Sequence, residues 1–129
     1  MKKQTILVVD DDREIVRAIS KLLELEGYET LKAYDGMEAL DMLMDHTVHL
    51  ILMDVMMPVM DGLAATRAIR AIPRADARQI PILAMTANAF EEDARQCLAA
   101  GMNVHLAKPL QMDKVLAALM ECCGKKKDL

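Results

Sequence analysis

Four short apolar runs in this chain each lead into a polar residue that could take part in phosphoryl chemistry. The first run, which begins at Ile6, leads into three consecutive aspartates, and the second leads into Asp54. The third run leads into Thr86, and the fourth leads into Lys108. Carboxylates bind hard cations and can attack phosphorus, and a hydroxyl and an ammonium can stabilise negative charge on phosphoryl oxygens. The residue types therefore indicate phosphoryl transfer at a metal site.

The runs themselves predict the elements that would bring these residues together. Short apolar runs bounded by turn signals are typical of buried strands, and strands that alternate with helical patterns predict a parallel sheet. The expected strands cover about 6–9, 29–33, 49–53, 80–85 and 104–107, and the expected helices cover about 13–25, 37–43, 63–71, 90–100 and 112–122. Because parallel strands end at the same rim of a sheet, the polar residues are expected to meet there.

The predicted fold class is α/β, a doubly wound five-stranded parallel sheet with five helices. Alternation alone does not give the strand order, and the flavodoxin-like order 2-1-3-4-5 is adopted by analogy. Asp12 is expected to cap the first helix, and the segment 72–79 is expected to be a surface connection. Residues 1–124 are predicted to form one domain, followed by a basic tail or linker start at 125–129.

Composition limits the functional classes that the chain could serve. With 129 residues and 53% apolar content, the chain can bury the core of one domain. A net charge of −4 argues against a nucleic-acid-binding face. No apolar stretch is long enough to cross a bilayer, so we expect a cytoplasmic protein without a membrane partner. Cys97, Cys122 and Cys123 lack the spacing of a zinc site and are expected to be reduced thiols.

The consecutive aspartates predict a bound divalent cation. Adjacent carboxylates repel one another unless a cation lies between them, and hard oxygen ligands favour Mg²⁺ or a similar ion. Asp54 from a neighbouring strand would complete such a site and could attack phosphorus to form an acyl phosphate. Lys108 and Thr86 would then share the developing charge. Any one of these residues alone is more simply a helix cap or turn residue, and only the combination favours the chemistry.

Four motifs make the chain resemble response-regulator receiver domains over essentially its full length. The run Ile6–Asp11 is similar to the family's first strand and acidic pair, and Asp54–Gly62 is similar to its phosphoacceptor strand end and following loop. Met85–Ala89 and Lys108-Pro109 resemble its switch and lysine motifs. The segment from Thr86 to Asn103 most resembles receivers of hybrid sensor histidine kinases, a cue that standalone receivers share.

The resemblance implies a metal site and a phosphorylated residue. Asp54 would be the phosphoacceptor, and Asp11 would bind Mg²⁺ directly. Asp10 would help through water or a secondary contact, and the backbone carbonyl of Met56 would complete the protein ligands. Mn²⁺ is an alternative to Mg²⁺. Asp12 lies outside the family's acidic pair.

The resemblance also implies a switch. Thr86 and Lys108 would engage the phosphoryl group, and a shift of Thr86 would admit the residue at position 105, altering the surface of the fourth helix, fifth strand and last helix. His105 departs from the family, which usually has Tyr or Phe there. A partly exposed strand residue tolerated for its size is favoured over a pH-sensitive switch. Lys108-Pro109 is expected to have a cis bond, as is common in the family.

Met56 and Asn88 are expected to tune dephosphorylation, because their side chains would flank the water that attacks the acyl phosphate. The methionine side chain cannot orient water by hydrogen bonding, whereas the asparagine amide can. A moderately long-lived acyl phosphate is expected. His46 and His49 are expected to be surface residues at element boundaries and not metal ligands.

By resemblance, the chain would be a signalling domain that catalyses its own phosphorylation and dephosphorylation, and not a classical enzyme. Its partner would be a sensor histidine kinase or a histidine phosphotransfer domain, and it could belong to a longer hybrid protein. It would be a monomer or a weak phosphorylation-dependent dimer.

Two other classes remain open from the sequence. A small Mg²⁺-dependent phosphatase of the haloacid-dehalogenase type would use Asp10 as nucleophile, with Thr86 and Lys108 in supporting roles. Against it, no acidic pair follows Lys108, and Asp54 would have no role. A flavodoxin-like FMN-binding module has the same layout, but it needs a phosphate-cradling loop where this chain has aspartates.

Overall fold

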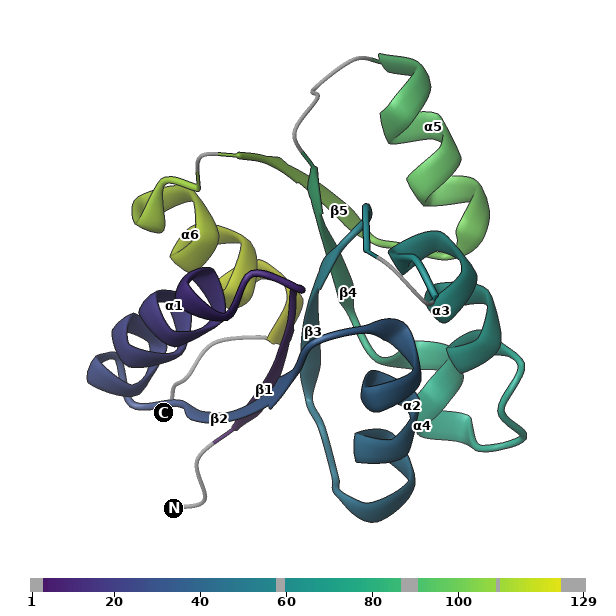
Figure 1. Ribbon diagram of the computed structural model, residues 1–129, viewed down its shortest axis with the longest axis horizontal. Coiled ribbons are helices and arrows are strands. Elements are labelled where there is room, and N and C mark those ends of the chain that lie inside the picture. The colour runs from purple at the N-terminus through teal and green to yellow at the C-terminus, as the bar shows by residue number, and fades with distance from the viewer. Residues whose placement is uncertain (1–3, 58–59, 87–90, 109, 124–129) are drawn as a thin grey trace.

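The computed structural model describes residues 4–57, 60–86, 91–108 and 110–123, and it contains a five-stranded parallel sheet with helices on both faces (Figure 1). The strand order is β2-β1-β3-β4-β5, which confirms the expected topology. The strands are β1 (Thr5–Val9), β2 (Glu29–Ala33), β3 (Leu50–Asp54), β4 (Ile82–Thr86) and β5 (Val104–Ala107). All four strand pairs are parallel, so every strand ends at the same rim.

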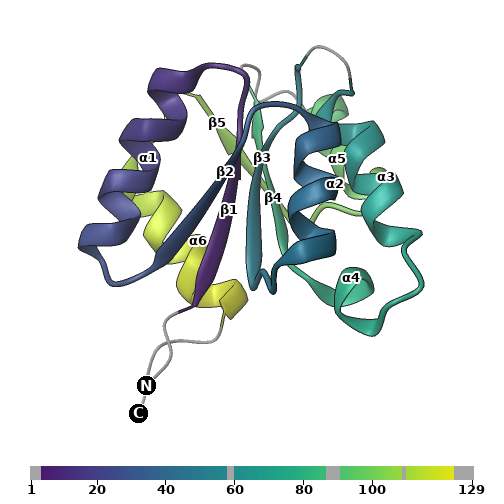
Figure 2. The same ribbon diagram turned by 60° about the horizontal axis from the view of Figure 1, so that its bottom comes forward.

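Helices cover the sheet in two layers. They are α1 (Arg13–Leu25), α2 (Gly36–Asp45), α3 (Gly62–Arg70), α4 (Ala75–Gln79), α5 (Glu91–Ala100) and α6 (Met112–Cys123). Helices α1 and α6 lie on one face, and α2, α3 and α5 lie on the other (Figures 1 and 2). None of the helices in the described part of the chain is long and apolar enough to cross a membrane.

Two hydrophobic clusters fill the spaces between the sheet and its helices. Strand β3 is buried along its whole length and supplies both clusters, because successive side chains of a strand point to opposite faces. Leu50 and Leu52 pack with residues of α1 and α6, and Ile51 and Met53 pack with residues of α2 and α3. Burying each side chain of this size stabilises the fold by about 1.5–3 kcal/mol. The core therefore fixes the central strand, and with it the position of Asp54.

The number of helices differs from the expectation of five, because the described residues contain a sixth. The segment 72–79 was expected to be a surface connection, yet Ala75–Gln79 forms the short helix α4. Ala77 is buried against the cluster beneath α2 and α3, and Arg74 bonds Asp76 through two nitrogens at 3.0 and 2.9 Å. One buried alanine among charged residues gives no periodic signal, which explains why the sequence did not predict this helix.

Aspartates begin three of the helices at the rim where the strands end. The Asp12 carboxylate accepts hydrogen bonds from the backbone N–H groups of Glu14 and Ile15 at 3.0 and 3.3 Å, so the expected cap of α1 is confirmed. Asp35 and Asp61 cap α2 and α3 in the same way. The loops after β1, β2 and β3 thus each lead into a helix whose first turn is capped by an aspartate.

Candidate functional site

Residues from β1, β3 and β5 meet at the carboxyl rim of the sheet. Asp10 directly follows β1, Asp54 is the last residue of β3, and Lys108 directly follows β5. Oxygen atoms of Asp10, Asp11 and Asp54 all lie within 4.8 Å of one another. The predicted convergence of carboxylates and an amine is therefore present in the fold.

Lys108 joins the two buried carboxylates of this cluster. Its Nζ lies 2.9 Å from Asp10 Oδ2 and 3.3 Å from Asp54 Oδ1. The backbone N–H of Lys108 donates to the carbonyl of Thr86 at 2.7 Å. This bond holds the residue that follows β5 against the end of β4. Burial lowers the pKa of Lys108, but the hydrogen bond to Asp10 and the charges of both carboxylates outweigh it, so the pKa is raised overall. The ammonium is thus held in its charged form between two acidic side chains.

Asp10 is held by the protein at both of its carboxylate oxygens. Oδ1 accepts a hydrogen bond from the Asp12 backbone N–H at 3.0 Å, and Oδ2 accepts the one from Lys108. Asp10 is only 1% exposed, whereas Asp11 is exposed to solvent. Asp10 is therefore a fixed acceptor at the floor of the site, and Asp11 is the accessible carboxylate at its edge.

Asp54 has a perturbed acidity. Burial, and next the nearby charge of Asp10, raise its pKa, while Lys108 lowers it, and together they raise the pKa from 3.8 to about 6. The residue is only 4% exposed. A divalent cation would relieve this repulsion, and carboxylate oxygens are the ligands that Mg²⁺ prefers. The donor set of Asp10, Asp11 and Asp54 therefore fits such an ion.

The loop after β3 folds back on the backbone of Asp54. The Gly62 N–H donates to the Val55 carbonyl at 2.9 Å. A Cβ atom on Gly62 would collide with the carbonyl oxygen of Asp54, so only glycine fits at this position. Met56 lies in this loop with its side chain 75% exposed. The roles expected for Met56 in metal binding and dephosphorylation stay predictions.

Thr86 and His105 contact each other directly. The Thr86 hydroxyl and His105 Nε2 are 2.9 Å apart. Thr86 pairs with Ala107 across β4 and β5, so His105, two residues earlier in β5, lies on the same face of the sheet. Thr86 is only 5% exposed, whereas His105 is partly exposed, as expected. Sequence analysis paired these positions as a switch but did not predict a hydrogen bond between them.

Several other expectations have simpler outcomes. Asn88, Pro109 and the predicted domain boundary at residue 124 lie outside the described residues. His46 and His49 are exposed and lie outside the acidic cluster, and His49 Nδ1 accepts a hydrogen bond from a backbone N–H at 2.9 Å. Cys97 is buried, and Cys122 is partly buried.

One contact near the start of α1 was not predicted from the sequence. The Arg13 guanidinium lies 3.9 Å from the centre of the Tyr34 ring. Arg13 follows the cap of α1, and Tyr34 directly follows β2. The position of Tyr34 at a strand end was the one available signal, since parallel strands end together.

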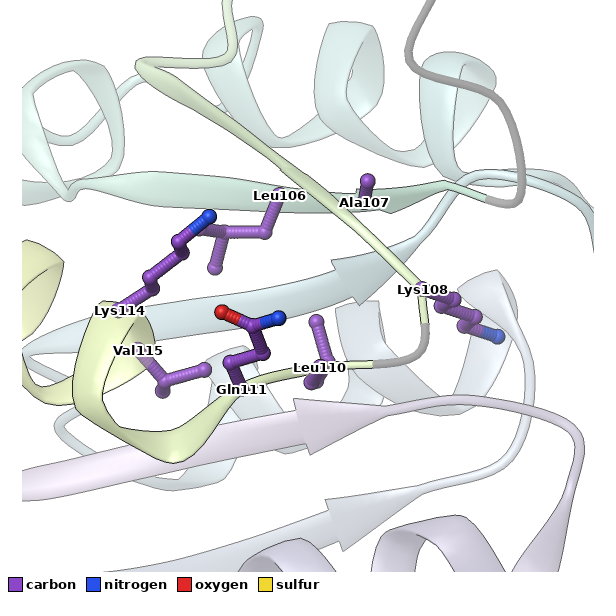
Figure 3. Close-up of a pocket in the computed structure, with 7 residues that line it drawn as sticks. All are labelled: Leu106, Ala107, Lys108, Leu110, Gln111, Lys114 and Val115. Carbon is purple, nitrogen blue, oxygen red and sulfur yellow. The ribbon is translucent and has the colours of Figure 1, made fainter.

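A hollow of about 250 Å³ lies between β5 and the start of α6. Besides Lys108, it is lined by Leu106, Ala107, Leu110, Gln111, Lys114 and Val115. Figure 3 shows the Lys108 side chain pointing away from the other lining residues. Its ammonium is engaged by Asp10 and Asp54 instead. The hollow is therefore distinct from the acidic cluster, and Lys108 stands at the border between them.

The sequence of this chain matches a family model and is similar to two proteins of known type. The family model described as "Response regulator receiver domain" matches residues 6–120. The transcriptional regulatory protein CpxR of Escherichia coli K12 is 38% identical over 88% of this chain and 47% of its own length. The osmosensing histidine protein kinase SLN1 of Saccharomyces cerevisiae is 39% identical over 92% of this chain and 10% of its own length. The chain thus spans half or less of these two relatives.

A solved structure agrees with this similarity. The receiver domain of the sensor histidine kinase PA1611 from Pseudomonas aeruginosa PAO1 has a TM-score of 0.86 and 38% identity, covering 96% of this chain and 100% of that chain. That structure has a magnesium ion coordinated in its active site cleft. Because the family model matches residues 6–120, most of its length, the chain belongs to the response regulator receiver domain family.

Proposed function

We propose that this receiver domain accepts a phosphoryl group on Asp54 from a phosphohistidine and relays it as a signal. The observation that carries the proposal is the position of the Lys108 ammonium, which contacts Asp54 and Asp10 at the rim where Asp11 also converges. A carboxylate nucleophile, a fixed cation and a set of hard oxygen ligands are the groups that phosphoryl transfer requires.

Magnesium would be held by Asp11 and Asp54, with the Met56 carbonyl as a further ligand and Asp10 as a secondary contact. Mn²⁺ would suit the same oxygen ligands. When bound, the ion supplies positive charge that neutralises phosphoryl oxygens during transfer. The magnesium described for the PA1611 receiver supports this assignment.

The protein's own groups account for the transfer step. A carboxylate oxygen of Asp54 forms a bond to phosphorus while the phosphorus–nitrogen bond to the donor imidazole breaks, and the electron pair stays on that nitrogen. Lys108 is already placed within 3.3 Å of Asp54 and would bind an oxygen of the incoming group. Thr86 would donate its hydroxyl proton to another oxygen. Hydrolysis of the acyl phosphate by water, tuned by Met56 and Asn88, would end the signal.

The phosphatase alternative would make Asp10 the nucleophile. Both Asp10 oxygens are already bonded within the protein. Attack through either Asp10 oxygen would therefore compete with a hydrogen bond that this oxygen already accepts, and on Oδ2 that bond comes from a cation. Asp54 is the last residue of β3 and ends at this rim, with its Oδ1 3.3 Å from the Lys108 ammonium. These observations favour Asp54.

Labelling identifies the nucleophile. The protein is incubated with acetyl phosphate and Mg²⁺, the acyl phosphate is trapped by borohydride reduction, and the modified residue is located by mass spectrometry. We expect modification at Asp54 and none in Asp54→Asn, with Asp12→Asn as a matched aspartate control at the helix cap. Modification at Asp10 instead would overturn the proposal in favour of the phosphatase.

The phosphoryl donor would be a sensor histidine kinase or a histidine phosphotransfer domain. Similarity to a receiver segment within the kinase SLN1 and to the PA1611 receiver supports this class of partner. The surface that changes would be formed by α5, β5 and α6, because Thr86 and His105 join the end of β4 to β5. Phosphotransfer from a panel of purified, phosphorylated kinases and phosphotransfer domains tests the choice of donor.

A further inference from the structure

The hydrogen bond between Thr86 and His105 gives His105 a role that an aromatic hydrocarbon ring could not serve. A threonine hydroxyl carries a single proton, so it can donate one hydrogen bond while its oxygen accepts others. In the structure the hydroxyl is 2.9 Å from His105 Nε2. At this distance either the hydroxyl or the ring nitrogen is the donor, depending on which nitrogen of the imidazole carries the proton.

Thr86 stands between the strand that carries the phosphoacceptor and the strand that carries His105. Asp54, the last residue of β3, pairs with Met85 of β4, and Thr86 is the next residue toward the rim. On the other side, β4 pairs with β5, where His105 lies. The Thr86 backbone is fixed on this side too, because its carbonyl accepts the Lys108 N–H at 2.7 Å. A phosphoryl group on Asp54 and the His105 ring would therefore approach the hydroxyl from opposite sides.

These two partners place different demands on the hydroxyl. Phosphoryl oxygens carry negative charge and act as hydrogen-bond acceptors. If Thr86 donates its only proton to the phosphoryl group, its oxygen can keep the bond to His105 only as an acceptor. His105 Nε2 must then carry a proton and donate it. The opposite arrangement, with the hydroxyl donating to Nε2, would leave Thr86 without a proton for the phosphoryl oxygen.

From this geometry we infer that His105 is a positioning residue for Thr86: phosphorylation of Asp54 selects the ring state in which Nε2–H donates to the Thr86 hydroxyl, and this bond directs the hydroxyl proton toward the phosphoryl group. The inference rests on the proposed role of Asp54 as phosphoacceptor. It makes His105 a stabiliser of the phosphorylated state, and not a residue accepted for its size alone.

The ring nitrogens report the proposed change directly. Protein labelled with ¹⁵N-histidine is examined by NMR at one fixed pH in the presence of Mg²⁺, with and without BeF₃⁻ as the acyl phosphate mimic. We expect the Nε2 of His105 to have the shift of a protonated ring nitrogen in the BeF₃⁻ form, while the ring shifts of the exposed His46 stay constant. An unprotonated Nε2 in the BeF₃⁻ form would overturn the inference.

Variants at the same position separate donation from size. His105→Phe keeps a ring but has no donor, and we expect it to bind BeF₃⁻ about tenfold more weakly, the cost of one lost hydrogen bond. His105→Gln places an amide N–H near the position of Nε2 and is expected to restore most of the affinity, whereas His46→Gln is expected to have none of these effects. BeF₃⁻ binding to His105→Phe that equals or exceeds that of the wild type would contradict the inference.

One comparison separates this inference from the proposed function. If wild-type protein binds BeF₃⁻ and Asp54→Asn does not, the phosphoacceptor assignment stands, and the state of Nε2 then decides the role of His105. If wild type and Asp54→Asn respond alike to BeF₃⁻, the proposed function fails, and the inference about His105 fails with it. Thermal unfolding of each variant checks that it is folded.

Discussion

Lys108 Nζ lies 2.9 Å from Asp10 Oδ2, although the two residues are separated by 98 positions in the chain. The same ammonium is 3.3 Å from Asp54 Oδ1, so one cation contacts two buried carboxylates that follow or end neighbouring strands. Removal of Lys108 would leave two buried carboxylates without a counter-charge, whereas removal of the Asp54 charge would leave Lys108 paired with Asp10. The bond therefore links the stability of the rim to the chemistry proposed for it.

Replacing Lys108 by Met should slow phosphorylation of Asp54 by about a hundredfold, because the transferred oxygens lose a fixed cation. The rate is measured with acetyl phosphate at saturating Mg²⁺, by mass spectrometry of the acyl phosphate. Lys114→Met is the matched control, since Lys114 is exposed and lines the neighbouring hollow. An unchanged rate in Lys108→Met would show that Lys108 only holds the carboxylates in place.

Which residues meet at the carboxyl rim of the sheet could be predicted from the sequence, but most hydrogen bonds between them could not. Alternating apolar runs predicted the strands, and parallel strands ending together predicted that Asp10, Asp54 and Lys108 would meet. The direct bond from Thr86 to His105 depends on the register between β4 and β5, which no local pattern encodes. A one-residue change of register would turn His105 to the other face of the sheet.

Long-range contacts by polar side chains were also beyond sequence reasoning. Arg70 of α3 donates to the Gly101 carbonyl at 3.1 and 2.7 Å and to the Ala77 carbonyl at 3.0 Å. It also donates to the Asn103 side chain at 2.9 Å. These bonds join the segments around α4 and β5, but each partner is a carbonyl or amide that many positions could offer. Helix α4 was missed for a related reason, because one buried alanine holds it.

Asp54→Asn should stabilise the protein near pH 7 in the absence of divalent cations. The native pKa of Asp54 is about 6 against an ordinary 3.8, so the folded state binds this proton more tightly than the unfolded state does. The resulting stabilisation is present below about pH 3.8 and is lost as the pH rises through about 6. A two-unit difference corresponds to about 3 kcal/mol, and we expect a gain on the order of 2–3 kcal/mol for the variant.

Urea denaturation in EDTA at several pH values measures this gain. The difference between Asp54→Asn and wild type should shrink steadily between about pH 6 and pH 4. Asp41→Asn, at an exposed position of α2, should show no comparable gain. A difference that is constant across this pH range would mean that ionisation of Asp54 is not the cause.

Apparent Mg²⁺ affinity should fall as the pH is lowered through about 6, the pKa of Asp54. Below this pKa the ion must displace a proton from the carboxyl group, so affinity is expected to drop about tenfold between pH 7 and pH 5. The chain has no tryptophan, so isothermal titration calorimetry is a suitable measurement. In Asp54→Asn the affinity should be weaker at pH 7 and depend less on pH over this range. An equally steep decline in that variant would assign the proton to another carboxylate.

Gly62→Ala should lower both the stability of the protein and the phosphorylation of Asp54. The added methyl group would meet the Asp54 carbonyl and the Val55 backbone, neither of which can move without shifting the end of β3. Such overpacking costs about 1–3 kcal/mol. Arg67→Ala, at an exposed position on the same helix, is the control for general effects on α3.

The loss of stability and the loss of Asp54 phosphorylation in Gly62→Ala are measured separately, under conditions where the variant is folded. Urea denaturation gives the loss of stability, and labelling with acetyl phosphate under strongly native conditions gives the loss of reactivity. Because the collision displaces the backbone of the phosphoacceptor itself, we expect reactivity to stay low even at a temperature where the variant is fully folded. If labelling returns to the wild-type rate whenever the variant is folded, the glycine serves stability alone, and the loop after β3 does not set the position of Asp54.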